Sequence, residues 1–226
     1  MCTVVCRWSP ETTVHLLAVR DEFVGREFDG PARWWPQQPD VIGGRDRQAG
    51  GTWCACDVRT GAIAVVLNRP DRPQAQPGAA SRGVLPLLAL AHGTSWPERL
   101  DLAPMASFNL MLATASELTW WTFDGDSLLR TDLTPGVHMA KPRGLVDSPA
   151  PRLTDPDQWR ATLAATEVRA DPSGLLVRVE RGEAVYASVF AQFITATPGF
   201  LTIDHSRTPR QPDSFEHGEW RVALSS

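Results

Sequence analysis

Short apolar runs, separated by turn-forming residues, follow one another along most of the chain and predict strands. The first two runs, residues 3–8 and 14–19, flank the turn signal Ser9-Pro10-Glu11, so we expect the chain to open with a β-hairpin. Similar runs predict further strands at residues 53–58, 62–67, 108–114, 118–123, 127–132, 175–180, 185–193, 200–204 and 220–224.

Two segments have helical character. Residues 84–92 form an apolar stretch that ends at Gly93, and residues 155–166 begin with Asp-Pro and have helical spacing. Residues 68–83 are rich in proline and alanine, which is typical of a loop. Many strands and few helices predict an α+β fold with mostly antiparallel sheet, and the length suits a single domain over residues 1–226.

The composition limits the classes of partner that the chain can have. A formal net charge of -4 provides no overall basic field for nucleic acid. No apolar run reaches the roughly 18 residues of a membrane span, so we expect none. The first residues lack the basic and apolar regions of a secretory signal, so we expect a cytoplasmic protein whose four cysteines are reduced thiols.

The cysteine that follows Met1 carries the first candidate chemistry. Removal of Met1 would leave Cys2 with a free α-amine, whose reference pKa is about 8. Such an amine can take the proton from the thiol of its own residue, so that no separate base is needed. The alternative is a small buried residue on the opening strand.

Two polar sites stand where predicted strands end. In the expected hairpin, the second strand returns to the start of the first, so that Arg20 or Asp21 lies beside Cys2. A guanidinium there would lower the thiol pKa, and a carboxylate would hold an ammonium. A solvated charge cluster is the alternative. Asn68 ends a later strand, where its amide can serve an oxyanion hole or cap the turn at Pro70.

Several motifs in order carry a family resemblance. They are MCTVVCRW, LAVRDEF, WWP, GGRDRQAGGTW, VVLNRP, FNLML and LTPGVH. The chain resembles the NRDE family, also called the transport-and-Golgi-organisation-2 family, which is similar to the N-terminal nucleophile (Ntn) hydrolases. The resemblance implies a four-layer αββα sandwich with two mostly antiparallel sheets. It also implies that Cys2 is the nucleophile, Arg20 neighbours the thiolate, Asp21 holds the amine and Asn68 donates to the oxyanion.

The chain departs from the family pattern in three segments. Val19 replaces the asparagine of the Asn-Arg-Asp-Glu signature, residues 139–144 lack an expected asparagine, and Ala196 stands where the family has an arginine. Removal of one oxyanion donor costs about a hundredfold to a thousandfold in turnover. The departures therefore predict a degenerate site with few charges, lined instead by apolar side chains that include tryptophan.

Other chemistry-bearing residues have simpler interpretations. Cys2, Cys6, Cys54 and Cys56 could form a zinc site if their strands met, although structural zinc pairs usually have two to four intervening residues. The alternative is small buried side chains. The glycine pairs in GGRDRQAGG fit a close-packed turn better than a phosphate loop, and His138 fits an ordinary loop histidine.

Two functions follow from these observations. The first is a protein that binds a small hydrophobic ligand, haem or an acyl chain, with little or no catalysis. The resemblance implies these two ligands, because the family has been linked to haem mobilisation and to lipid metabolism. The second is a cysteine N-terminal-nucleophile amidohydrolase or acyltransferase that acts on a linear amide, cleaving a non-peptide C–N bond with Cys2 as nucleophile.

Overall fold

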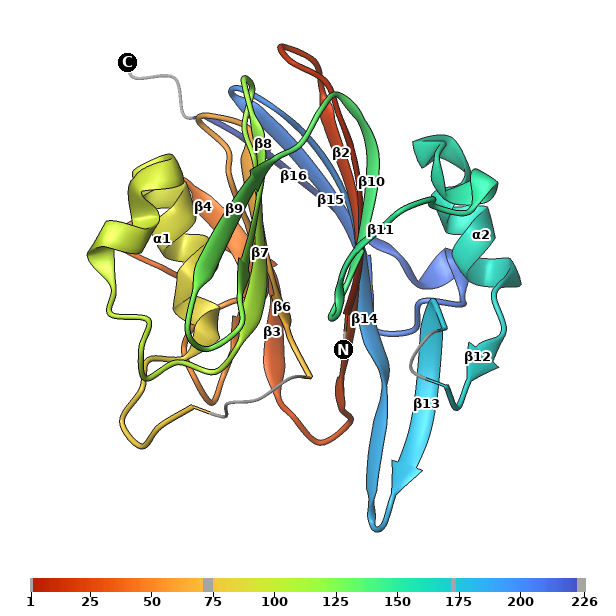
Figure 1. Cartoon of the computed structure of the whole chain (residues 1–226). Coiled ribbons are helices and arrows are strands. Elements are labelled where there is room, and N and C mark those ends of the chain that lie inside the picture. Colours follow the sequence, from red (N-terminus) through yellow and green to blue (C-terminus); the bar gives the residue numbers. More distant parts are fainter. Residues whose placement is uncertain (1, 71–74, 172–173, 223–226) are drawn as a thin grey trace.

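Two β-sheets face each other, and each has a helix on its outer side (Figure 1). The computed structural model describes residues 2–70, 75–171 and 174–222. Helix α1 (Leu85–His92) covers one sheet, and helix α2 (Trp159–Ala165) covers the other. This layer order confirms the expected αββα sandwich with mostly antiparallel sheets.

The first sheet contains both ends of the described chain. Its central path is β11 (Gly144–Val146), β10 (Gly136–Lys141), β1 (Cys2–Trp8), β2 (Val14–Phe23), β14 (Ala184–Thr197), β13 (Leu176–Arg181) and β12 (Val168–Arg169). The long strand β14 also pairs with β15 (Phe200–Ser206), which pairs with β16 (Glu216–Arg221). Among the described pairings only β12 with β13 is parallel.

The second sheet is a simple meander, because its strands are neighbours in the order in which the chain makes them. They are β3 (Phe28–Ala32), β4 (Val41–Asp46), β5 (Cys54–Asp57), β6 (Ala62–Asn68), β7 (Phe108–Ala113), β8 (Leu118–Phe123) and β9 (Leu128–Asp132). The short 3-10 helices are η1 (Arg82–Val84), η2 (Gly93–Arg99), η3 (Pro151–Leu153), η4 (Pro156–Gln158) and η5 (Pro212–Ser214).

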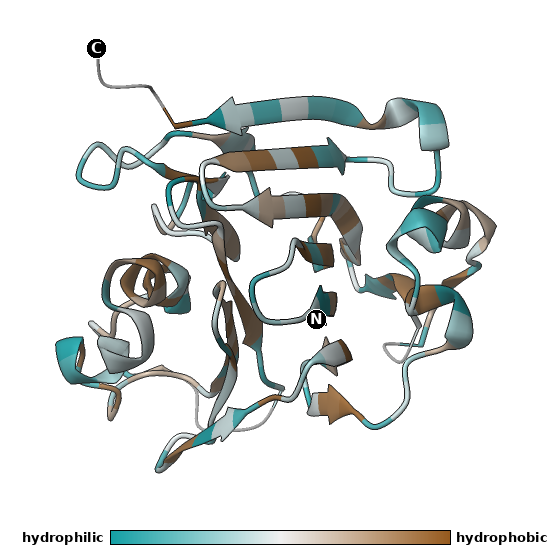
Figure 2. Ribbon diagram, turned by 90° about the horizontal axis from the view of Figure 1, so that it is seen from above, coloured by the Kyte–Doolittle hydropathy of each residue, from teal (hydrophilic) through white to brown (hydrophobic). Residues whose placement is uncertain are grey.

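Three apolar clusters separate the four layers. Side chains alternate along a strand, so Val4 and Cys6 of β1 face the cluster between the sheets, whereas Val5 faces the cluster under α2. A third cluster packs α1 against the second sheet through residues such as Leu85 and Trp96. In Figure 2 the central strands are largely brown, whereas β16, which leads to the C-terminus, is largely teal. No helix within the described residues is long and apolar enough to cross a membrane.

Most of the predicted elements exist, with shifted ends. The opening hairpin is confirmed, and the predicted helix at 155–166 divides into η4 and α2. The last predicted strand, 220–224, is largely displaced by β16, and its residues 223 and 224 lie outside the described chain. So do residues 71–74 of the predicted loop, whose end forms η1. The prediction missed β3, β4, β10, β11 and β12, because these strands are short or contain glycine and charged residues.

Candidate functional site

The opening hairpin places Cys2 directly opposite Arg20. The two are Cα partners in the antiparallel pairing of β1 with β2, and Asp21 is the next residue of β2. Arg20 and Asp21 are buried, while Cys2 is partly exposed. The register thus brings the three residues together, as the sequence predicted.

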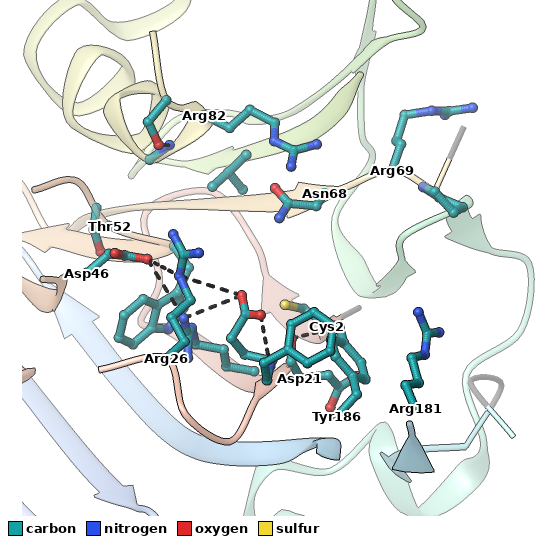
Figure 3. A pocket seen from close by; sticks show the side chains of 18 residues that line it. Cys2, Asp21, Arg26, Asp46, Thr52, Asn68, Arg69, Arg82, Arg181 and Tyr186 are labelled. Atoms are coloured by element: carbon teal, nitrogen blue, oxygen red, sulfur yellow. Dashed lines mark hydrogen bonds and ion pairs between the residues drawn. The ribbon is translucent and has the colours of Figure 1, made fainter. Parts of the chain in front are cut away.

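A pocket of about 500 Å³ opens at this end of the sandwich (Figure 3). Cys2, Arg20, Asp21 and Asn68 all line it, so the structure brings the four predicted site residues to one cavity. Asn68 ends β6 of the second sheet, and Figure 3 shows it on the wall across from Cys2. The pocket therefore lies between the edges of the two sheets.

The Cys2 thiol lies close to charges of both signs. Although the residue is partly exposed, the surrounding protein desolvates the thiol, and this burial raises its pKa. The negative charge of Asp21 also raises the pKa, whereas a backbone hydrogen bond at Asp21 and the charge of Arg20 lower it. An additional positive group at Cys2 would favour the thiolate.

Asp21 is held by strand β14. Burial raises the pKa of its carboxyl from 3.8 to about 6. The hydrogen bond from Ser188 and the positive charge of Lys141 lower the pKa but do not outweigh burial. The Ser188 hydroxyl donates to Asp21 Oδ1 at 2.6 Å and accepts from the Val177 backbone N–H at 2.9 Å. The Tyr186 hydroxyl donates to the Asp21 backbone carbonyl at 2.8 Å. Side chains from β14 thus fix the position of Asp21.

Arg20 packs against aromatic rings at the side of the pocket. Its guanidinium carbon lies 4.9 Å from the ring centre of Phe28 and 4.6 Å from that of Trp53, within the range of cation–π contacts. Its Nη2 lies 3.6 Å from Glu22 and 3.9 Å from Asp46. Its buried Nη1 has no hydrogen-bond partner among the described residues.

Besides Arg69, which belongs to the quoted VVLNRP motif, the pocket has three further arginines that the sequence interpretation overlooked: Arg26, Arg82 and Arg181. Arg26 pairs with Asp46 at 2.7 Å. Arg82 comes from η1 and Arg181 from the end of β13, so neither is near Cys2 in the sequence. The only sequence signal for Arg26 was its place just after the Arg-Asp-Glu run.

The expected apolar lining is therefore wrong. Besides these arginines and Arg20, the pocket wall includes Arg69 and the carboxylates of Asp21, Glu22 and Asp46. Trp53 does line the pocket, but charged side chains surround it. The prediction failed because it weighed only the residues that depart from the family pattern. It did not count the charges that the quoted motifs already contain, and Arg26, Arg82 and Arg181 come from segments that it did not connect with a site.

The family departures have different structural meanings. Ala196 pairs with Val14 and Leu201 and is buried between the sheets, and it does not line the pocket. In the segment 139–144, Lys141 acts electrostatically on Asp21. The Pro142 carbonyl accepts a hydrogen bond from Asn109 Nδ2 at 2.9 Å. The segment that lacks the expected asparagine thus still borders the site.

The remaining sequence candidates are structural. Gly51 approaches the Gly83 backbone so closely that an added Cβ would lie 2.5 Å from its carbonyl atoms, which confirms close packing at the second glycine pair. The first pair, Gly43 and Gly44, lies within strand β4, so the predicted turn is wrong there. Cys6, Cys54 and Cys56 are free thiols buried between the sheets. Among the described residues, no group of three or more His, Cys, Asp or Glu side chains is placed to hold a metal ion, so the zinc alternative finds no support. His138 contacts the Thr134 carbonyl at 2.7 Å and is not part of the pocket wall.

Two facing sheets between helical layers, with a thiol in a charged pocket at the start of the first strand, define an αββα protein with a cysteine-centred site. The sequence matches the family model for Transport and Golgi organisation 2 over residues 1–177, and the chain belongs to that family. Among solved structures the chain is similar to the Caenorhabditis elegans N-acylethanolamine-hydrolyzing acid amidase (NAAA) ortholog. The identity is 12%, the alignment covers 99% of this chain and 100% of that chain, and the TM-score is 0.40. No curated protein matches the sequence.

Proposed function

We propose that the chain is a cysteine amidohydrolase or acyltransferase that acts on non-peptide C–N amide bonds. The observation that carries this proposal is the meeting of Cys2, Arg20, Asp21 and Asn68 in one pocket, from three strands. The proposal requires removal of Met1, so that the α-amine and the thiol belong to the same residue.

The chemistry follows from the two groups of Cys2. The α-amine accepts the thiol proton, the sulfur attacks the amide carbonyl, and the Asn68 amide stabilises the resulting oxyanion. The amine then passes its proton to the departing nitrogen, which leaves as a free amine. The remaining thioester is cleaved by water, or by a second amine in acyl transfer, and the thiol is regenerated. Asp21 holds the ammonium form of the α-amine and favours proton transfer to it.

The charged lining supports this chemistry over simple binding of an apolar ligand. Buried Arg20 and Asp21 are costly to desolvate, and Ser188 and the rings of Phe28 and Trp53 are arranged around them. Strongly perturbed carboxyl groups in a cleft are typical of functional sites.

Binding of haem or an acyl chain remains the second candidate. Its specific support is the part of the wall formed by Phe23, Trp53, Val66 and Tyr186, which offers apolar surface beside the arginines. A ligand with both an apolar body and an anionic end fits that combination. This candidate predicts saturable binding without turnover.

Paired assays decide between the two candidates. Mature protein, with loss of Met1 verified by mass, is incubated with a panel of acyl amides, and haem or an acyl chain is titrated by tryptophan quenching. The enzyme proposal predicts hydrolysis that Cys2→Ala abolishes, while the exposed control Arg59→Gln retains it. Absence of hydrolysis across the panel, together with saturable haem or acyl-chain binding that survives Cys2→Ser, would overturn it.

A further inference from the structure

The arginines of the pocket differ in how their charges are balanced. Arg20 and Arg26 share the carboxylates of Glu22 and Asp46 within 4 Å. Arg82 also lines the pocket, yet no carboxylate within the described residues lies in ion-pair range of it; Glu22 attracts it only from farther away. The cavity therefore contains positive charge that the described protein does not neutralise.

Arg82 is fixed in place. Its Nη1 donates to the Ser107 backbone carbonyl at 2.9 Å, and this leaves most of the guanidinium donors available. The next residue, Gly83, is held against Gly51 and accepts a hydrogen bond from the Thr52 backbone N–H at 2.9 Å. Figure 3 shows the guanidinium reaching into the pocket from the wall across from Cys2. A side chain anchored in this way is suited to hold a ligand group in a defined position.

Two other groups extend the positive character of the wall. Arg181, at the end of β13, lines the pocket and lies 5.4 Å from the Tyr186 ring centre, and none of the ion pairs found among the described residues involves it. The buried Nη1 of Arg20 also has a free donor within that part of the chain. An anion bound in the pocket would supply acceptors to the available guanidinium donors of Arg82 and Arg181, whereas Arg20 Nη1, which has almost no exposed surface, would act on it through charge alone.

We propose that the pocket is specific for amides that carry an anionic group, a carboxylate or a phosphonate-like group close to the amide bond, and that Arg82 is its main anchor. This inference names the substrate class and rests on the proposed function. A guanidinium binds carboxylate and phosphonate oxygens through paired hydrogen bonds, and both ligand chemistries therefore satisfy the same site. The amide carbonyl is then directed to Cys2 and Asn68.

Binding to the Cys2→Ala variant tests the inference without catalysis. Isothermal titration compares N-hexanoylglycine with N-hexanoylglycinamide, two ligands of nearly equal shape that differ by one charge. A third ligand, N-hexanoylaminomethylphosphonate, distinguishes carboxylate from phosphonate recognition. We expect an anionic ligand to bind at least about tenfold more tightly than the neutral one, because a charged hydrogen bond is lost in the latter.

The second arm replaces the anchor. Arg82→Gln in the Cys2→Ala background should remove most of the preference, whereas Arg59→Gln, which removes an equal charge at an exposed turn outside this pocket, should leave it unchanged. Equal binding of charged and neutral ligands, binding of neither, or a preference that survives Arg82→Gln would overturn the inference. Selective binding combined with no hydrolysis by the mature wild-type protein would overturn the proposed function alone.

Discussion

Replacement of Asp21 by asparagine should stabilise the fold at neutral pH while removing activity. Burial raises the pKa of this carboxyl from 3.8 to about 6, so at pH 7 the folded protein carries a carboxylate that its surroundings disfavour. A difference of about two pKa units corresponds to about 3 kcal/mol. Asparagine retains an oxygen that can accept the Ser188 hydrogen bond, but it places an amide beside Lys141. We therefore expect a net gain of between about 1 and 3 kcal/mol in the free energy of unfolding.

The stability difference between Asp21→Asn and the wild-type protein should depend on pH. Below pH 3.8 the carboxyl is protonated in both the folded and the unfolded protein, and there is no penalty. Between pH 3.8 and about 6 the folded state retains a proton that the unfolded state has lost, so the wild-type protein loses stability as pH rises. The advantage of Asp21→Asn should grow over this range and stay constant above it. Urea unfolding of both proteins at a series of pH values measures the difference.

A second carboxyl provides a control of opposite sign. Hydrogen bonds from Arg47 and Arg45 lower the pKa of Asp29, which lies outside the pocket wall. Asp29→Asn should therefore destabilise the protein at pH 7, and the loss should shrink only as pH falls through the lowered pKa. An Asp21→Asn variant that is less stable than wild type at pH 7, or an advantage that does not change between pH 4 and 7, would refute the reasoning.

Three further predictions concern neighbouring parts of the site. Ser188→Ala should raise the pKa of Asp21 further and move the acid limb of the kcat/KM profile to higher pH; an unmoved limb would contradict this. Gly51→Ala should lower the free energy of unfolding, measured in urea, by about 1 to 3 kcal/mol, because the added Cβ would clash with the Gly83 backbone. Gly25→Ala is the control and should be nearly neutral, because the space around Gly25 is open. Iodoacetamide should modify Cys2 before the other cysteines of the native protein, because those are buried. The rate should still rise beyond pH 9, since burial raises the pKa of the Cys2 thiol. Mass mapping identifies the labelled cysteine, and faster labelling of another cysteine would contradict the prediction.

The sequence predicted the parts of the fold that local patterns determine. Alternating apolar residues and the Ser-Pro-Glu turn predicted the first hairpin, and the hairpin alone was enough to bring Arg20 or Asp21 beside Cys2; the structure shows that Arg20 is the residue directly opposite. Asn68 was found because it ends an unmistakable strand. Short strands such as β3 and β4 were missed because glycine and charged residues hide their periodicity.

The rest of the site depends on long-range packing, which no local pattern records. Arg82 lines the pocket and Ser188 holds the Asp21 carboxyl, although the two lie about 80 and 186 residues beyond Cys2 and nothing in their local sequence marks them. The sequence comparison treated Ala196 as a lost arginine of the site. The residue lies in the core between the sheets, so it does not correspond to a position in the pocket. Residue-by-residue comparison therefore underestimated the charge in the cavity.

Strand β14 has a consequence for the order of events during synthesis. It pairs with β2 along most of its length, and its Ser188 and Tyr186 hydroxyls donate to the carboxyl and to the backbone carbonyl of Asp21, respectively. A ribosome must therefore complete about nine-tenths of the polypeptide before the first hairpin can find its permanent neighbour. The removal of Met1 that the proposed function requires would therefore take place before β14 pairs with β2. The two hydroxyl groups that hold Asp21 beside Cys2 would thus arrive last, and the proposed site would be complete only near the end of synthesis.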